Sequence, residues 1–139
     1  MSFAPADAAG PSDAPTRDPF ATVELEIPSG DEFAAVARLV VAGVATRAGL
    51  QVDRLQDLEL ALEEALRQPS ARETLTLAAT PTPDDLEVEV GPLASAPLDT
   101  RGRGGVLSTL VDEIRTRRSG AQVWIALRMR RPVLNQWRK

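Results

Sequence analysis

Two helical patterns that follow each other between residues 31 and 67 constrain the fold more than any other feature of the sequence. The first predicts a helix over about 31–48, because five apolar residues recur at the i, i+3, i+4 spacing of one helix face: Phe33, Val36, Ala37, Val40 and Val44. Ser29 and Glu32 have the spacing of a capping box at its start, and Gly49 suits a left-handed cap at its end. Two such helices need a second layer against which to bury their apolar sides.

The second pattern predicts a helix over about 54–67, where Asp53 and Gln56 repeat the capping-box spacing. One stripe of this helix is apolar and is expected to face the core: Leu55, Leu58, Leu62, Ala65 and Leu66. A second stripe, expected on the far side of the helix, follows the spacing i, i+4, i+7, i+11: Asp57, Ala61, Glu64 and Gln68. This second stripe holds the carboxylate and amide groups of functional interest.

Strand patterns flank the helix pair. Alternating apolar residues predict four strands, of which the middle two form a hairpin across "PTPD": 22–28, 73–80, 85–90 and 121–130. A loop rich in Gly and Pro occupies 91–105, a third helix is predicted over about 106–117, and Trp124 is expected to pack against a helix. The order predicts an α/β (α+β) fold, a two-layer sandwich with helices on one face of a mixed, mostly antiparallel sheet.

Composition limits the functions of such a domain. The 139 residues suit one domain, expected over 20–131 between a disordered leader, 1–19, and a short tail, 132–139. Without His or Cys the chain lacks the usual groups of a zinc site, a thiol nucleophile and an imidazole base. A net charge of -4 argues against nucleic acid as the main partner. No apolar run suits a membrane span, so a soluble cytoplasmic protein is expected.

Residues 33–66, "FAAVARLVVAGVATRAGLQVDRLQDLELALEEAL", resemble the first two helices of the anti-sigma-factor serine kinases of bacterial partner-switching systems. The order of elements is similar to the nucleotide-binding fold of histidine kinases and gyrase, the histidine-kinase-like (GHKL, Bergerat) ATPase fold. In this family the second helix carries an E-A-x-x-N box, whose Glu is the general base and whose Asn holds magnesium. The resemblance places Glu64 at the base and Gln68 at the metal-holding amide.

Departures from the family pattern indicate a degenerate nucleotide site. Gln68 displaces the amide oxygen by one methylene, and magnesium tolerates little deviation from octahedral geometry. The family's D-x-G-x-G motif falls on "GPLAS", where Pro92 and Ala94 replace the adenine-binding Asp and the first Gly. The segment that forms the lid over ATP is truncated. Gly102 and Gly104 of "RGRGG" remain as phosphate-binding candidates at the start of the third helix.

Two functions remain open, and the sequence favours the first. The first is a regulatory protein that needs no cofactor. It acts by binding a sigma factor, a STAS-type anti-sigma antagonist or a second copy of itself. The alternative is an active serine kinase that uses ATP and Mg to phosphorylate the antagonist and sequesters a sigma factor. Only then is Glu64 a catalytic base, and otherwise it is a solvated helix residue. Gly102 and Gly104 are otherwise turn residues. The resemblance makes Arg38 a partner-contacting residue, with a solvated surface Arg as the alternative. No metal ligand is assigned.

Overall fold

The computed structural model describes residues 20–95 and 106–132. Its elements follow in chain order: β1 (Val23–Pro28), η2 (Asp31–Phe33), α2 (Ala34–Arg47), α3 (Val52–Leu66), β2 (Thr74–Pro81), β3 (Asp85–Leu93), α4 (Val106–Leu110), β4 (Glu113–Ser119) and β5 (Gln122–Arg130). The predicted leader over 1–19, the tail residues 133–139 and the two candidate glycines, Gly102 and Gly104, lie outside the described residues. Within the described ranges, no helix is long and apolar enough to cross a membrane.

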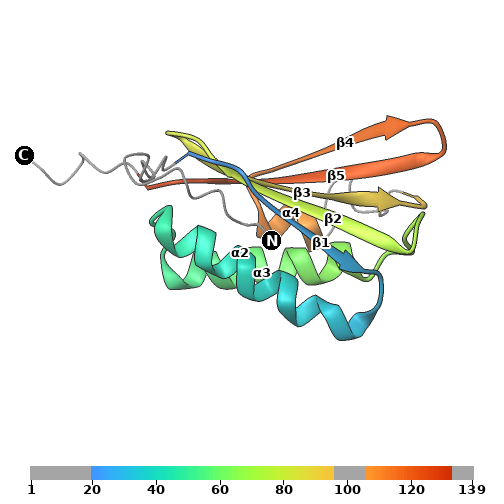
Figure 1. The fold of residues 1–139 in the computed structure, drawn as a ribbon. Coiled ribbons are helices and arrows are strands. Elements are labelled where there is room, and N and C mark those ends of the chain that lie inside the picture. The colour runs from blue at the N-terminus through green and yellow to red at the C-terminus, as the bar shows by residue number, and fades with distance from the viewer. Residues whose placement is uncertain (1–19, 96–105, 133–139) are drawn as a thin grey trace, which may run out of the picture.

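Five strands form one sheet in the order β1-β2-β3-β5-β4, and each neighbouring pair is antiparallel. Helices α2, α3 and α4 all lie on one face of this sheet (Figure 1). The predicted two-layer α+β sandwich is therefore confirmed, as is the hairpin of β2 and β3. We call the other side of the sheet the open face. Its outward side chains come from alternate strand positions: Glu24, Glu26, Thr76, Ala78, Thr80, Glu87, Glu89, Trp124, Ala126, Arg128, Arg115 and Arg117.

The core lies between the sheet and the helices, because the strands alternate buried and outward positions. In β2, β3 and β5 the buried positions point towards the helix layer: Leu75, Leu77, Ala79, Leu86, Val88, Val90, Val123, Ile125, Leu127 and Met129. Helix α3 meets them with its predicted apolar stripe, in which Leu58, Leu62 and Ala65 are fully buried and Leu55 and Leu66 pack against the core. Each fully buried Leu contributes roughly 1.5–3 kcal/mol to folding.

Helix α2 turns only part of the predicted face to the core: Ala37 is buried and Phe33 and Val44 pack against the core, whereas Val36 does not. Its buried side chains are small: Ala37, Val41 and Ala45. Val36 is 43% exposed, and Val40 and Val44 are only half-buried. Apolar residues surround most of this helix, so their spacing does not decide which side packs. Short side chains let the helix approach the sheet closely, and this packing decides the buried face.

The helix ends are near their predicted positions but use other chemistry. Gly49 has φ +89°, the left-handed conformation predicted after the first helix. The two predicted capping boxes are wrong, because the N-cap residues are Phe33 and Gln51, and neither makes a side-chain capping bond. Asp53 lies inside the first turn of α3, where its Oδ1 accepts a hydrogen bond from the amide of Arg54 at 3.0 Å.

The predicted third helix over 106–117 is wrong after its first turns. Helix α4 ends at Leu110, and β4 then pairs along its whole length with β5 across a tight turn. Gly120 makes that turn with φ +64°. The apolar spacing of Leu107, Val111 and Ile114 fits one continuous helix as well as a helix followed by a strand. Pairing with β5 decides between them, and pairing with a distant strand cannot be read from local spacing.

Candidate functional site

The C-terminal end of α3 holds the two residues that the resemblance singles out. Oε1 of Glu64 accepts a hydrogen bond from Nη1 of Arg67 at 2.7 Å, so the carboxylate is paired with a guanidinium. Nε2 of Gln68 donates to the main-chain carbonyl of Glu64 at 3.2 Å. The structure thus brings Glu64 and Gln68 together, and both make contacts within the helix end itself. Their stripe is not a solvated far side, because Ala61 in its middle is fully buried.

After α3 the chain turns and pairs with the end of β3. Residues 69–71 and 92–94 make this contact, which we call the clamp, around a β-bridge between Ser70 and Leu93. Pro69 ends the helix, since proline has no amide hydrogen with which to continue the helical ladder. Leu93 is fully buried, so the clamp also closes the core at this end of the sheet.

Two backbone hydrogen bonds hold the clamp. The amide of Ala71 donates to the carbonyl of Pro92 at 2.9 Å, and the amide of Ala94 donates to the carbonyl of Pro69 at 2.8 Å. Pro92 and Ala94 stand where the family motif has its adenine-binding Asp and its first Gly. At both positions a backbone group is used by the clamp, and neither side chain has a group that can hydrogen-bond a purine.

The residue before the clamp is covered by an aromatic ring on the open face. A Cβ on Gly91 would lie 2.6 Å from two ring atoms of Trp124, so the ring packs directly on this glycine. The guanidinium of Arg117 lies 5.0 Å from the ring centroid and pairs with Glu89 at 3.1 Å. The prediction that Trp124 packs against a helix is wrong, because it occupies an outward position of β5.

Arg38 links the two long helices. Its Nη1 donates to Oε2 of Glu63 at 2.8 Å, and both side chains are about one-third exposed. A hollow of about 390 Å³ opens beside this pair and is also lined by Gln56, Glu59 and Leu60. The ion pair therefore holds the Arg38 guanidinium at the surface of the helix layer, where another protein can reach it.

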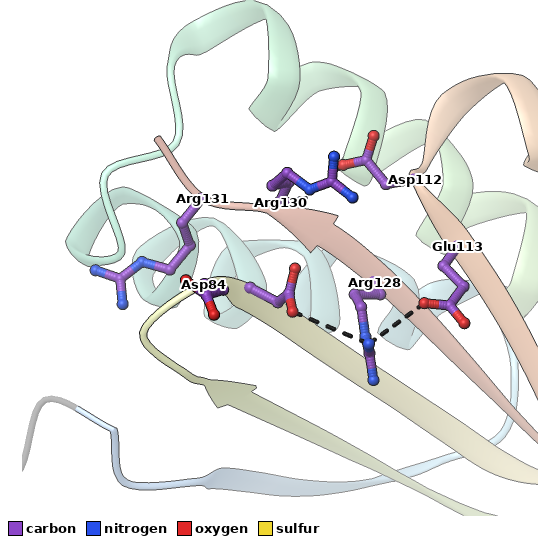
Figure 2. Close-up of a pocket in the computed structure, with 7 residues that line it drawn as sticks. Asp84, Asp112, Glu113, Arg128, Arg130 and Arg131 are labelled. Atoms are coloured by element: carbon purple, nitrogen blue, oxygen red, sulfur yellow. Dashed lines mark hydrogen bonds and ion pairs between the residues drawn. The ribbon is translucent and has the colours of Figure 1, made fainter. Parts of the chain in front are cut away.

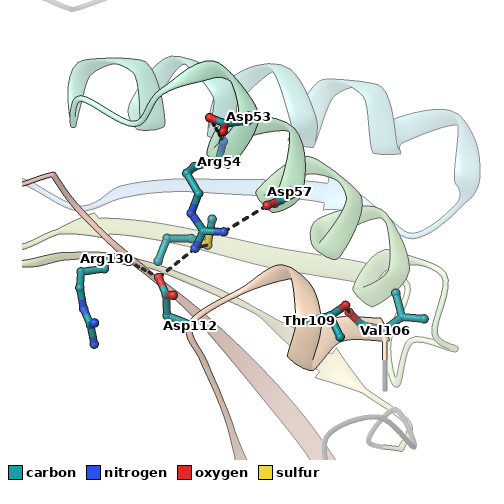
Figure 3. Close-up of polar contacts among 8 residues, drawn as sticks. Asp53, Arg54, Asp57, Val106, Thr109, Asp112 and Arg130 are labelled. Carbon is teal, nitrogen blue, oxygen red and sulfur yellow. Dashed lines mark hydrogen bonds and ion pairs between the residues drawn. The ribbon is translucent and has the colours of Figure 1, made fainter. Parts of the chain in front are cut away.

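The N-terminal end of α3 is held by a charged network that local sequence patterns do not reveal. Arg54 donates to Oδ2 of Asp57 at 3.1 Å and to Oδ2 of Asp112 at 3.0 Å (Figure 3). Oδ2 of Asp112 also accepts from the amide of Arg130 at 2.7 Å. We call these four residues the Arg54 node, and it ties α3 to the start of β4 and to the end of β5. Arg54 and Asp112 are 58 positions apart, too far for any spacing rule.

A second charged cluster surrounds an open hollow of about 420 Å³ at the same end of the sheet. Arg128 lies between Oδ2 of Asp85 at 4.0 Å and Oε1 of Glu113 at 3.3 Å (Figure 2). The remaining lining residues are Asp84, Asp112, Arg130 and Arg131. Carboxylates and guanidiniums largely neutralise each other here. In the described part of the chain, no group of three or more acidic residues is placed to hold a metal ion.

Known proteins match both the sequence and the fold. The serine-protein kinase RsbW of Bacillus cereus (strain AH187) is 41% identical over 46 residues, which are 33% of this chain and 29% of the relative. RsbW of Bacillus thuringiensis (strain Al Hakam) matches with the same values. The crystal structure of the RsbU and RsbW domains of Rv1364c from Mycobacterium tuberculosis aligns with a TM-score of 0.56 and 15% identity, over 81% of this chain and 33% of that chain. No family model matches the chain.

Over part of its length, the chain is similar to the serine-protein kinase RsbW, which supports a relation to the anti-sigma-factor serine kinase family. Its fold is the histidine-kinase-like ATPase fold of the RsbW domain, as the order of elements predicts. The matched stretch spans less than a third of the length of the curated RsbW kinases.

In this RsbW-like chain, the candidate residues separate into distinct places. Glu64 and Gln68 lie at the C-terminal end of α3, immediately before the clamp, whereas Arg38 lies on the surface of the helix layer. Helix α4, at whose start the family binds phosphate, has five residues and therefore a short dipole. Arg54 and Asp112 were missed, and only a three-dimensional contact reveals them.

Proposed function

We propose that this chain is a regulatory protein that acts by binding a protein partner in a bacterial partner-switching pathway, without ATP or magnesium. The partner is a sigma factor or a STAS-type anti-sigma antagonist, and the complex forms in the cytoplasm, where bacterial transcription takes place. One observation carries the proposal. The clamp occupies the backbone at the two positions, Pro92 and Ala94, at which the family motif approaches adenine.

A purine can enter at these positions only if the clamp opens. Opening breaks two hydrogen bonds, at a net loss of roughly 1–3 kcal/mol. It also exposes Leu93, which is fully buried, at about 1.5–3 kcal/mol. Since 1.4 kcal/mol is a factor of ten in affinity, these losses weaken ATP binding by roughly two to four orders of magnitude. No Asp carboxylate is present at Pro92 to compensate for them.

The contacts of Glu64 and Gln68 give further support. A general base has to reach the hydroxyl that it deprotonates, and the ion pair with Arg67 at 2.7 Å occupies the Glu64 carboxylate. The Gln68 amide is turned towards the Glu64 carbonyl at 3.2 Å. Both side chains therefore have structural contacts at the helix end, which suits a protein that retains the scaffold of a kinase.

The helix layer offers a surface for the partner. Leu39 is 74% exposed on α2 and Leu60 is 52% exposed on α3, with Arg38 and its hollow close to Leu60. Exposed apolar side chains around an Arg are typical of protein interfaces. We therefore assign partner contact to Arg38 and these two leucines.

Calorimetric titration of the full chain with Mg-ATP is the direct test of ATP independence. We expect no binding at millimolar nucleotide and no phosphate transfer to a serine of a purified STAS-type antagonist. A sub-millimolar Kd or measurable transfer would overturn the proposal and support the active serine kinase. The same titration on two clamp variants tests whether the clamp excludes the nucleotide. Ala71→Pro removes one of the two amide donors of the clamp, whereas Ala71→Ser keeps it.

Partner binding is tested with the sigma factors and STAS-type proteins of the source bacterium, in the presence and absence of Mg-ATP. We expect one of them to bind with the same Kd in both conditions, and Glu64→Ala to leave that Kd unchanged. Arg38→Ala is expected to raise it by about tenfold or more. Arg47→Ala removes the same charge from the exposed end of α2 and is the matched control. Equal effects of the two Arg substitutions would contradict the assignment of Arg38.

A further inference from the structure

Strand β4 forms a free edge of the sheet and concentrates positive charge there. Among the described residues it pairs only with β5, so it closes the order β1-β2-β3-β5-β4 on one side (Figure 1). Its seven residues include three arginines, Arg115, Arg117 and Arg118, and one acidic residue, Glu113. The chain as a whole has a net charge of -4. This strand is therefore a basic edge on an acidic protein.

The three arginines differ in how firmly they are held. Arg117 pairs with Glu89 at 3.1 Å and also lies over an aromatic ring, so it has a fixed place on the open face. Arg115 pairs with Glu113 of its own strand at 3.4 Å, and both side chains are about half exposed. Arg118 is exposed and has no ion pair with any described residue. Arg115 and Arg118 can therefore take up carboxylates from another molecule.

The pairing with β5 divides the side chains of β4 between the two faces of the sheet. Arg115 and Arg117 lie on the open face. Ile114, Thr116 and Arg118 lie on the side of the helix layer, where Ile114 packs against the core but the other two are exposed. Among the described elements, the helix layer thus covers only the beginning of β4. Positive charge flanks the free edge on both faces.

The free edge offers main-chain groups as well as charge. In an antiparallel sheet, alternate residues of an edge strand direct their amide and carbonyl away from their only neighbour, which leaves on the order of three such residues in β4. Among the described residues, the main chain of 113–119 makes no hydrogen bond outside its pairing with β5. An extended segment that adds beside β4 would pair with these groups and place its side chains next to the arginines.

We propose that β4 is the docking edge for an extended acidic segment of a partner protein, which adds to the sheet as a sixth strand antiparallel to β4. In this arrangement three carboxylates of the segment lie opposite Arg115, Arg117 and Arg118. Along the segment they occupy two consecutive positions and a third position two residues later. The position between them lies opposite Thr116. The position after them lies opposite the half-buried Ile114 and suits an apolar side chain.

Charge also decides which strands this edge rejects. A second β4 is repelled, because its arginines would lie against those of the first. The other free edge, β1, carries the exposed Glu24 and Glu26 and therefore repels an acidic segment, so such a segment recognises one edge of the sheet only. Nucleic acid is also anionic, but its phosphates accept hydrogen bonds and donate none, which leaves the outward carbonyls of β4 without partners.

The position of β4 makes this contact independent of the proposed contact at Arg38. Helix α2, which carries Arg38, packs on β1 and β2 at the other side of the sheet. A short acidic segment binds weakly when it is isolated, because ordering its residues offsets much of the gain from the new hydrogen bonds. Its affinity also falls as salt screens the ion pairs. Within a whole partner protein, the same segment adds affinity to a contact made elsewhere.

Titration of the full chain with an end-capped peptide, Thr-Glu-Glu-Val-Glu-Val-Thr, followed by NMR, tests the proposal. We expect saturable binding at low salt, with the largest amide shifts in 113–119 and slower hydrogen exchange of the outward amides of β4. A peptide with Lys in place of each Glu should not bind. A peptide with Pro in place of each Val and Thr keeps the three carboxylates but loses amide donors, so its Kd should be higher by about tenfold or more.

Variants of β4 test the register. Arg115→Glu and Arg118→Glu are each expected to raise the peptide Kd by about tenfold or more, because each places like charges opposite each other. Arg47→Glu makes the same change at the exposed end of α2 and should leave the Kd unchanged. A peptide with Lys in place of its first Glu should bind the Arg118→Glu variant more tightly than the original peptide does. Circular dichroism checks that each variant is folded.

Four results would overturn the proposal. The intact chain fails to bind the glutamate peptide, or binds the proline peptide equally well, which would reduce the contact to charge alone. A thymidine tetranucleotide, which also carries three negative charges, binds with an equal Kd and shifts the same amides. Sedimentation velocity shows self-association that Arg118→Glu abolishes, which would make β1 of a second copy the occupant of the edge. None of these results bears on the Mg-ATP titration or on the role of Arg38.

Discussion

The two ends of helix α3 are held to the rest of the protein in different ways. At the N-terminal end, Arg54 and Asp112 join charged side chains from distant segments at 3.0 Å. At the C-terminal end, the clamp joins two segments through the amides of Ala71 and Ala94, which donate to the carbonyls of Pro92 and Pro69, and a fully buried Leu93 lies beneath it. The first end is held by partly exposed charged side chains, whereas the second is held by backbone pairing above a buried leucine.

Under the proposed function, the difference locates where this sequence departs from the serine kinases that it resembles. The resemblance places the nucleotide motifs of those kinases at the C-terminal end of this helix and at the end of β3, which is the region that the clamp closes here. The resemblance over 33–66 is therefore mainly a resemblance of the scaffold that packs on the sheet. A helix pair that packs like a kinase scaffold and a C-terminal end closed by the clamp can coexist, because the core stripe of α3 and the residues Glu64 and Gln68 lie on different faces of the helix.

Removing the buried side chain of the clamp is expected to have the largest effect. Leu93→Ala deletes a fully buried side chain, so it should lower the free energy of unfolding by about 2–5 kcal/mol. Leu39→Ala makes the same change at a site that is 74% exposed, and should alter it by less than about 0.5 kcal/mol. Urea denaturation followed by circular dichroism measures both. Similar values for the two variants would show that the clamp end is not packed as described.

Gly91→Ala examines the strand that leads into the clamp. The added Cβ would lie 2.6 Å from the Trp124 ring, so we expect a loss of about 1–3 kcal/mol in unfolding free energy. Gly43→Ala is the matched control, because nothing lies within 4 Å of its added Cβ and alanine stabilises a helix interior by about 1 kcal/mol. In the background of Trp124→Ala the cost of Gly91→Ala should largely disappear. A cost that persists there would place the strain elsewhere.

Much of the scaffold could be predicted from local patterns. The strands around Leu25, Leu77, Val88 and Ile125 alternate regularly, and the Leu58 stripe of α3 repeats at helical spacing, so both kinds of period identify their elements. The sandwich follows from their order. The buried face of α2 was predicted only in part, because apolar residues cover most of its circumference and packing on the sheet adds Val41 and Ala45 to the predicted Ala37.

The candidate site was less predictable, because its contacts join distant segments. Pro69 ends α3 as its chemistry requires, yet pairing of the clamp also needs β3 to continue to Leu93. The predicted strand stops at residue 90. The Arg54 node depends on Asp112, which the predicted helix over 106–117 would have placed differently. Glu64 was located correctly on α3, but its ion pair with a neighbouring Arg was not foreseen.

At the other end of α3, Asp112→Ala tests the Arg54 node. The substitution removes the acceptor for Arg54 at 3.0 Å and for the amide of Arg130 at 2.7 Å. We expect about 1–2 kcal/mol less unfolding free energy, since these groups are partly exposed and water replaces some of the lost bonds. Glu59→Ala removes an acidic side chain from α3 outside the node and should change stability by less than about 0.5 kcal/mol. A loss as large as that of Leu93→Ala would mean that the two ends are equally buried.

The smallest effect is expected at the residue that the family uses as its base. Glu64→Gln removes the ion pair with Arg67, an exposed pair that contributes less than about 0.5 kcal/mol. Arg67→Gln breaks the same pair from the other side, so the two variants should have equal unfolding free energies. They should also bind the partner with equal Kd, because under our proposal Glu64 has no role beyond this pair. Denaturation and partner titration measure both quantities. A loss of phosphate transfer in Glu64→Gln alone would instead identify a base, and the C-terminal end of α3 would then be a working catalytic end as well as a structural one.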